Sequence, residues 1–155
     1  MPTAATLKYS GIKPGGLSRF RKSLNSSTVC PKFHQTGWHQ IAIALREDDS
    51  LIGDCGIHIL EEDARIVEIG ITLDPAYQSM GYASEALNAV LTKLFVELKK
   101  HRVIASVDPL NSPSIALMER IGMRKEGHFV KSLWFKNDWV DDVRFAMLAE
   151  EWNAK

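Results

Sequence analysis

The sequence predicts an α+β fold in which a mixed, mostly antiparallel, twisted sheet is flanked by helices. The first observation is a run of three segments rich in β-branched residues, QIAIALR, LIGDCGIHIL and RIVEIGITL. The second is an apolar stripe with helical spacing between residues 81 and 100, and the third is the order strand, helix, hairpin after it. Because 155 residues suffice for one core, we expect a single domain over 1–155, with an atypical arm at 1–37 and the main body at 38–152.

The three β-branched segments predict an antiparallel meander, because acidic turns separate them at 47–50 and 61–63. The residues before them predict an arm or loop, with a short strand at Thr6–Tyr9 as an option and one short helix in LSRFRKSL, residues 17–24.

One long amphipathic helix is predicted between Gly81 and Lys100. RVIASV, residues 102–107, then predicts a buried strand, and Ser112-Pro113 opens a second helix that ends at Gly122. Two apolar segments around the turn at 136–138 predict a closing hairpin. The apolar stripe of the long helix consists of Ala83, Ala86, Leu87, Val90, Leu91, Leu94, Phe95 and Leu98.

Composition and charge limit the classes of function. Hydrophobic residues make up 45% and charged residues 25%, and no apolar run reaches the ~20 residues that cross a bilayer, so we expect no membrane span. Residues 1–46 hold seven basic and no acidic side chains, so the remainder, with 12 basic and 19 acidic groups, carries a net charge of −7. An acidic body gives no support to a nucleic-acid-binding surface and favours a cationic partner.

Cysteine usage predicts a reducing compartment. Cys30 and Cys55 are too few for a disulfide framework and are expected to be buried or idle thiols. We therefore expect a cytoplasmic protein, although an acid-free N-terminus containing serine and arginine is also typical of a transit peptide.

The turn PAYQSMGYASEA, residues 75–86, lies between a predicted strand and a predicted helix. Backbone N–H groups of residues 78–84 lie near the helix N-terminus, where they attract phosphate oxygens, and Gly81 and Ala83 lack the bulk to block a ligand. The alternative is that Gly81 only permits a tight turn while Ala83 packs on the sheet. A Walker loop is not indicated, and the third glycine and parallel βαβ unit of a dinucleotide fingerprint are missing.

Four segments together resemble the GNAT superfamily of acetyl-CoA-dependent N-acetyltransferases, and within it the RimJ/RimL-like branch of ribosomal-protein N-terminal acetyltransferases. They are LIGDCGIHI, EIGITLDPAYQSMGYASEAL, HRVIASVDPLNSPSIALMERIGMRKEG and WVDDVRFAMLAEEW. The resemblance covers about residues 38–152 and implies the GNAT fold and acetyl transfer from acetyl-CoA to an amine.

The resemblance also implies which residues bind coenzyme A. The pantetheine arm is expected to pair with the backbone of Ile71, Thr72 and Leu73, and Asn111 and Ser114 match the family's Asn-x-x-Ser near the thioester. On structural grounds Asn111 or Ser112 is equally an N-cap. The pyrophosphate is expected to bind at Gln78, Ser79, Met80, Gly81, Tyr82, Ala83 and Ser84.

Acetyl transfer needs a neutral amine, so a general base is expected. Glu68 is the first candidate and His128 the second, with His58 a weaker one; each is otherwise a surface or ion-paired side chain. Met118 stands where many family members have a proton-donating tyrosine, which leaves Ser114, water or no specific group for the leaving thiolate. The histidines show no metal-binding spacing, so no metal is predicted.

The favoured acceptor is a protein or peptide N-terminal α-amine, because its pKa near 8 leaves more neutral amine than a lysine has. The alternatives are a small amine such as a polyamine or aminoglycoside, or an acetyl-CoA-binding module without turnover. The segment before IAIAL is shorter than is usual in the family, so either the acceptor cleft is more open or a second subunit covers it in a homodimer. Four C-terminal aromatic residues are expected to be mainly packing residues, with one or two in the acceptor cleft: Trp134, Phe135, Trp139 and Trp152.

Overall fold

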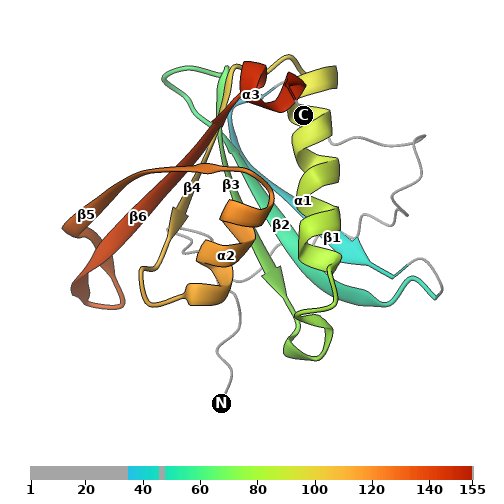
Figure 1. Cartoon of the computed structure of the whole chain (residues 1–155), viewed down its shortest axis with the longest axis horizontal. Coiled ribbons are helices and arrows are strands. Elements are labelled where there is room, and N and C mark those ends of the chain that lie inside the picture. Colours follow the sequence, from blue (N-terminus) through green and yellow to red (C-terminus); the bar gives the residue numbers. More distant parts are fainter. Residues whose placement is uncertain (1–34, 46–47, 155) are drawn as a thin grey trace.

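Six strands form one sheet in the order β1-β2-β3-β4-β6-β5, and the helices lie against it (Figure 1). The computed structural model describes residues 35–45 and 48–154. The strand expected at Thr6–Tyr9 and the helix expected at 17–24 lie outside the described residues, and the single-domain organisation stays a prediction.

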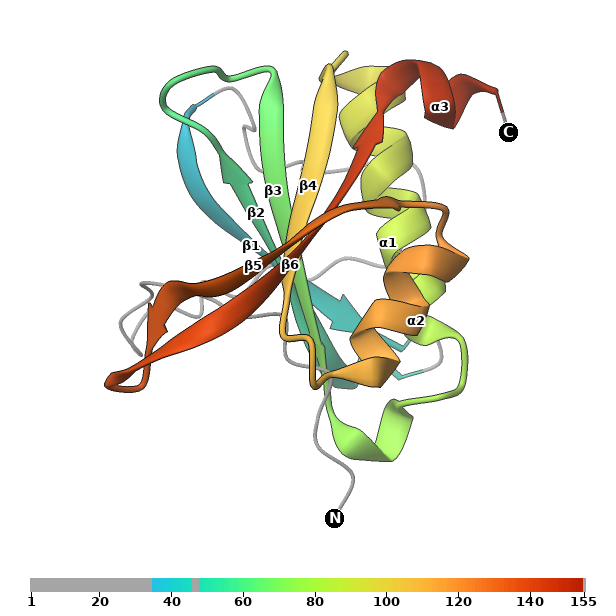
Figure 2. The ribbon, with the colours of Figure 1, turned by 60° about the vertical axis from the view of Figure 1, so that its left-hand side comes forward.

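The predicted antiparallel meander is confirmed. It consists of β1 (Gly37–Ala44), β2 (Leu51–Ile59) and β3 (Ile66–Leu73), which pair antiparallel in that order. Alternate residues of β2 and β3 belong to the buried core, which they share with α1: Cys55, Ile57, Ile59, Val67, Ile69, Ile71 and Leu73. The other face of these strands carries the polar side chains that the site uses, and both long helices lie on the core side (Figure 2).

The connection from β3 through α1 (Tyr82–Thr92) to β4 (Arg102–Val107) is a parallel βαβ unit. The sequence reading that such a unit is missing is therefore wrong, because the meander hides the single parallel pair. The pairing is short: within residues 48–154, β3 and β4 are in register only at Ile66–Arg102, Val67–Val103 and Glu68–Ile104. Beyond Glu68 the two strands diverge toward α2 (Figure 1).

The helix after Gly81 begins as predicted but changes geometry before its expected end. α1 runs to Thr92 and continues as a π-helical turn, η2 (Lys93–Glu97), in which the Leu98 N–H donates to the Lys93 carbonyl over 3.0 Å. The wider turn keeps the apolar stripe on the sheet side, where Leu94 and Phe95 are both buried.

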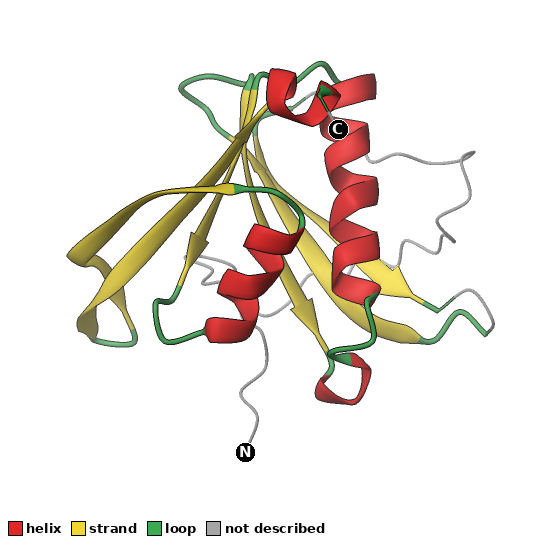
Figure 3. Cartoon of the chain, in the orientation of Figure 1, coloured by secondary structure: helices red, strands yellow, loops and turns green. Residues whose placement is uncertain are grey.

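The second half of the chain follows the predicted order, with the elements α2 (Ser112–Arg120), β5 (Arg124–Phe135), β6 (Asp138–Leu148) and α3 (Ala149–Asn153). Gly122, at φ +85°, ends α2, and Lys136 and Asn137 have φ of +50° and +64°, as a two-residue hairpin turn requires. The helix α3 was not expected (Figure 3). Its Glu151 carboxylate accepts a 2.7 Å hydrogen bond from the Leu148 N–H.

No helix in the described ranges combines the length and apolarity that crossing a bilayer requires.

Gly53 is expected to be indispensable for the pairing of β2 with β3. A Cβ at this position would lie 2.2 Å from the Thr72 carbonyl oxygen and 3.0 Å from the Leu73 Cα, both backbone atoms that cannot move alone. We expect Gly53→Ala to destabilise the fold by about 1–3 kcal/mol or more and lower the Tm by several degrees in calorimetry. Leu51→Ala, which truncates an exposed side chain of the same strand, is the control. Equal Tm values for the two variants would contradict the packing described here.

Candidate active site

The turn between β3 and α1 is held by side-chain hydrogen bonds. Asp74 caps the short 3₁₀ helix η1 (Pro75–Tyr77), its Oδ1 accepting from the Ala76 N–H at 2.8 Å. Gln78 Nε2 donates to the Leu73 carbonyl at 3.0 Å, so this side chain secures the end of β3. Ser79 and Gly81 have φ of +63° and +90°, which turns the chain into α1.

Gly81 is the N-cap of α1, and it supplies no side chain to the first turn of the helix. A Cβ added there would meet no atom within 4 Å, and the neighbouring Met80 side chain is 64% exposed. The N–H groups at the start of an α-helix have no intrahelical acceptor and lie at the positive end of its dipole. An anion therefore has open access to the amides of Tyr82, Ala83 and Ser84.

One edge of β3 faces β4, but the described register of the two strands ends at Glu68. From Ile69 to Leu73, β4 does not pair with this edge. The other edge of this segment is fully used, since Ile71, Thr72 and Leu73 pair with Cys55, Asp54 and Gly53 of β2. Alternate backbone groups of a strand point to opposite edges. An extended ligand can therefore pair with β3 as an added strand in the space where β4 diverges.

The N-terminus of α2 contains a buried hydroxyl without a partner. Asn111 is the N-cap, and its Oδ1 accepts from the Ser114 N–H at 3.1 Å. Ser114 is 1% exposed, and its Oγ has no hydrogen-bond partner among the described residues. Buried hydroxyls are nearly always paired, so a ligand atom is the natural partner for this one. Met118, one turn further on, is fully buried in the core.

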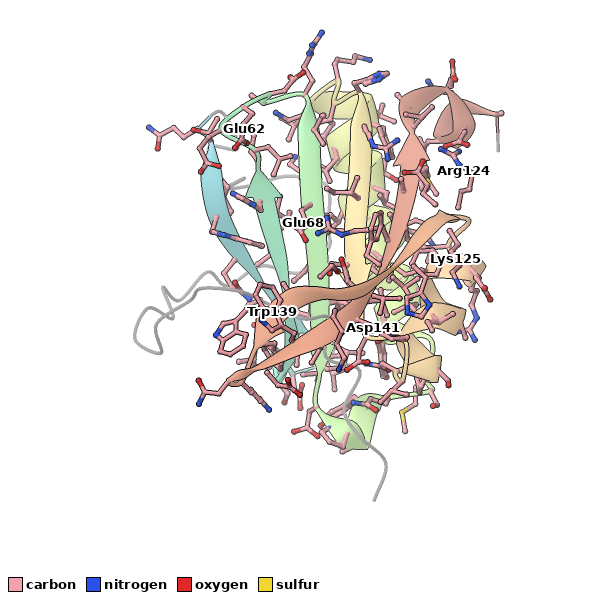
Figure 4. The ribbon with its side chains drawn as sticks, turned by 90° about the vertical axis from the view of Figure 1, so that its left-hand side faces the viewer. Glu62, Glu68, Arg124, Lys125, Trp139 and Asp141 are labelled. Carbon is pink, nitrogen blue, oxygen red and sulfur yellow. The ribbon has the colours of Figure 1, made fainter. Side chains whose placement is uncertain are left out.

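Glu68 lies in a cross-strand row on the face opposite the helices. The register places Trp38 of β1 opposite His58 of β2, and His58 opposite Glu68 of β3. Glu68 is also the last residue of β3 in register with β4, so it stands where the two strands separate. Figure 4 shows it midway along β3. This base candidate is therefore beside the open edge of β3.

His128 is placed on the β5–β6 hairpin, where its Nε2 lies 2.8 Å from Asp141 Oδ2. The hydrogen bond from the Lys131 N–H, followed by that from His128, lowers the pKa of the Asp141 carboxyl. Because Asp141 occupies Nε2, only Nδ1 of the neutral His128 ring is left to accept a proton while this contact is kept.

The sequence reading missed Asp54, which lies on the same face of β2 as His58. Gln40 Nε2 donates to Asp54 Oδ1 at 2.6 Å, and burial raises the pKa of this carboxyl despite that bond. In the sequence, apolar Cys55, Ile57 and Ile59 recur every second residue, and this period of two is the signal that places Asp54 and His58 together on the other face.

The C-terminal aromatic residues divide into two groups. Trp152 packs against Phe95, with ring centroids 6.1 Å apart. Trp134 and Trp139 form an edge-to-face pair at 5.4 Å and are each about half exposed, so they pack against each other at the surface and not in the core. They present an aromatic surface on the hairpin, where Figure 4 marks Trp139.

Cys55 is expected to be chemically inert in the folded protein. Burial, and then the charge of Asp54, raises the pKa of its thiol to about 12, so thiolate is almost absent at neutral pH. In a Cys30→Ser variant, we expect a thiol-specific chromogenic reagent at pH 8 to react only after denaturation. Rapid reaction of the native variant would contradict the burial of this side chain.

Within residues 35–45 and 48–154, no group of three or more His, Cys, Asp or Glu side chains has the arrangement of a metal site.

Comparison with known proteins identifies the family. A model described as an acetyltransferase (GNAT) domain matches residues 8–124. The uncharacterised N-acetyltransferase YnaD of Bacillus subtilis is 43% identical over 111 residues, which are 72% of this chain and 65% of that protein. The ribosomal-protein-serine acetyltransferase of Escherichia coli is 34% identical, with 79% of this chain and 66% of that protein covered. The chain thus spans slightly less than two thirds of these relatives.

Comparison with solved structures gives the same fold. A GNAT-family acetyltransferase from Bacillus anthracis superimposes with a TM-score of 0.68 at 41% identity, covering 72% of this chain and 67% of the other. A spermidine N-acetyltransferase from Vibrio cholerae shares the fold, with a TM-score of 0.69 at 23% identity and with 79% and 73% of the two chains covered. Because the GNAT domain model matches residues 8–124, which are most of the chain, and the mixed sheet agrees with that of a solved family member, the chain belongs to the GNAT acetyltransferase family.

Proposed function

We propose that this protein is an N-acetyltransferase that moves the acetyl group of acetyl-CoA to a primary amine, with a protein or peptide N-terminal α-amine as the favoured acceptor. The observation that carries the proposal is the divergence of β3 from β4 directly after Glu68. The divergence leaves an open edge of β3 to which an extended ligand can bind, and the Glu68 carboxylate lies at the start of this edge. Use of acetyl-CoA is a property of GNAT acetyltransferases.

Coenzyme A binding is assigned to three places. The amides at the start of α1, around Gly81, bind the pyrophosphate. The open edge of β3 at Ile71, Thr72 and Leu73 pairs with the pantetheine arm, and the unpartnered Ser114 hydroxyl lies at the N-terminus of α2 for a contact near the thioester. Gln78 contributes by fixing the turn.

The chemistry is nucleophilic attack by a neutral amine on the carbonyl carbon of the thioester, after which the C–S bond breaks. Glu68 accepts the proton that the amine must lose, directly or through water. A backbone N–H of β3 at the open edge stabilises the oxyanion, a contribution of a few kcal/mol per donor. Ser114 donates a hydrogen bond to the leaving sulfur, because Met118 offers no proton there.

An α-amine acceptor is favoured by acid–base chemistry and by one relative. With a pKa near 8, about a tenth of α-amines are neutral at pH 7, far more than of lysine amines, so a partly exposed carboxylate such as Glu68 is an adequate base. The Escherichia coli relative is named for a ribosomal protein. The net charge of −7 over residues 47–155 suits a cationic acceptor of either kind. A cytoplasmic location and a homodimer stay predictions.

Thermal shift with coenzyme A, followed by thiol release in the presence of acetyl-CoA and a panel of amines, tests the proposal. We expect stabilisation by coenzyme A and the fastest thiol release with N-terminal peptides. Faster thiol release with spermidine or an aminoglycoside would show that the acceptor is a small amine and not a protein N-terminus. Stabilisation by coenzyme A without turnover on any amine would indicate a binding module.

A further inference from the structure

His58 lies between two carboxylates on the face opposite the helices. Its Nε2 is 3.2 Å from Glu61 Oε2, in the turn after β2, and its Nδ1 is 3.9 Å from Glu68 Oε2 on β3. The imidazole ring stacks on the Trp38 indole, with centroids 4.3 Å apart and planes 13° from parallel. The stack restrains the plane of the ring, and the contact of Nε2 with Glu61 selects the orientation of the two nitrogens within that plane.

The three polar side chains form a row that leads from the partly buried Glu68 and His58 to the exposed Glu61. The Glu68 side chain is 23% exposed and the His58 side chain 18%, whereas Glu61 is 59% exposed. If Nε2–H donates to Glu61, the neutral ring presents the Nδ1 lone pair toward Glu68. That tautomer can accept a proton from the Glu68 carboxyl.

We propose that His58 is a positioning residue that relays to Glu61 and solvent the proton Glu68 takes from the amine. This inference rests on the proposed acetyltransferase function. Protonated Glu68 gives its proton to Nδ1, and Nε2 gives its own proton to Glu61, so the ring ends neutral with its proton on Nδ1. Glu61 loses the proton to water, and proton exchange with solvent returns the ring to the Nε2–H tautomer before the next turnover. The gap of 3.9 Å exceeds a hydrogen bond, so Glu68 must first rotate toward the ring or act through one water.

His58→Phe is the decisive variant, because phenylalanine keeps an aromatic ring on Trp38 and removes both nitrogens. We expect kcat to fall about tenfold, with an unchanged KM for acetyl-CoA and little change in Tm. Glu61→Gln should lower kcat in the same direction by less. His101→Phe, which replaces an exposed histidine outside this row, is the matched control and should keep full activity.

A double-mutant cycle separates a relay from a merely structural role. In a Glu68→Gln background, adding His58→Phe should cause no further loss of kcat, because there is no proton left to relay. Independent losses that multiply would overturn the inference, as would an unchanged kcat in His58→Phe.

Nitrogen NMR of the His58 ring reports its tautomer, needs no turnover and keeps the two proposals apart. We expect the proton of the neutral ring on Nε2 in the wild type and less of this tautomer in Glu61→Gln; a wild-type ring with its proton on Nδ1 would overturn the relay. A wild-type protein without acetyl transfer on any amine would overturn both proposals. If the wild-type protein transfers acetyl groups and His58→Phe is equally active, only the relay is overturned.

Discussion

Replacing Gly81 with glutamate should abolish coenzyme A binding while the protein stays folded. The new side chain meets no protein atom within 4 Å of its Cβ, so it enters open space. That space is where the amides of α1 are expected to receive the pyrophosphate, and a carboxylate there repels phosphate and competes for the same N–H groups. Titration calorimetry with coenzyme A measures the loss.

The control for this variant is Gly81→Ala. Both substitutions place an L-residue at φ +90°, which costs about 1–2 kcal/mol of stability, and only glutamate adds charge and length. We therefore expect similar Tm values for the two variants and measurable coenzyme A binding by Gly81→Ala alone. Equal affinity of Gly81→Glu and wild type would show that the phosphates bind elsewhere.

Replacing Glu68 with glutamine should lower kcat by about 10²–10⁴-fold while the Kd for coenzyme A changes little. Glutamine keeps the size of the side chain at the divergence of β3 and β4 but cannot accept a proton. Thiol release at saturating acetyl-CoA measures kcat, and titration calorimetry measures the Kd.

Glu62→Gln is the matched control, because Glu62 is an exposed carboxylate in the turn between β2 and β3 (Figure 4). It should keep wild-type kcat. A loss in Glu68→Gln no larger than in the control would remove Glu68 from the role of base.

Most of the fold could be predicted because its signals are local. The acidic turns mark the meander, the apolar stripe marks α1, and Ser112-Pro113 with Gly122 bounds α2. The parallel pairing of β3 and β4 could not be predicted, since pairing partners are set by tertiary packing and no spacing within either strand encodes them. The helix α3 is too short to give a periodic pattern.

The candidate site also contains a part that the sequence could predict and a part that it could not. The Gly81 turn is contiguous, so its residues and their place before a helix predict an anion site, with a merely structural turn as the alternative. The row of Trp38, His58 and Glu68 comes from three strands and exists only through their register. The buried Ser114 hydroxyl is a matter of packing, and the exposure of Trp134 depends on how far the β5–β6 hairpin extends beyond the helices.

The account depends on the free amides at the N-terminus of α1 binding a diphosphate, so that a thioester is carried along the open edge of β3 to Glu68. A crystal structure of the protein grown with saturating coenzyme A tests this most directly. We predict density for the diphosphate at Gly81, Tyr82 and Ala83 and for the pantetheine arm beside Ile71, Thr72 and Leu73. Coenzyme A bound away from both segments, or both segments left empty, would contradict it.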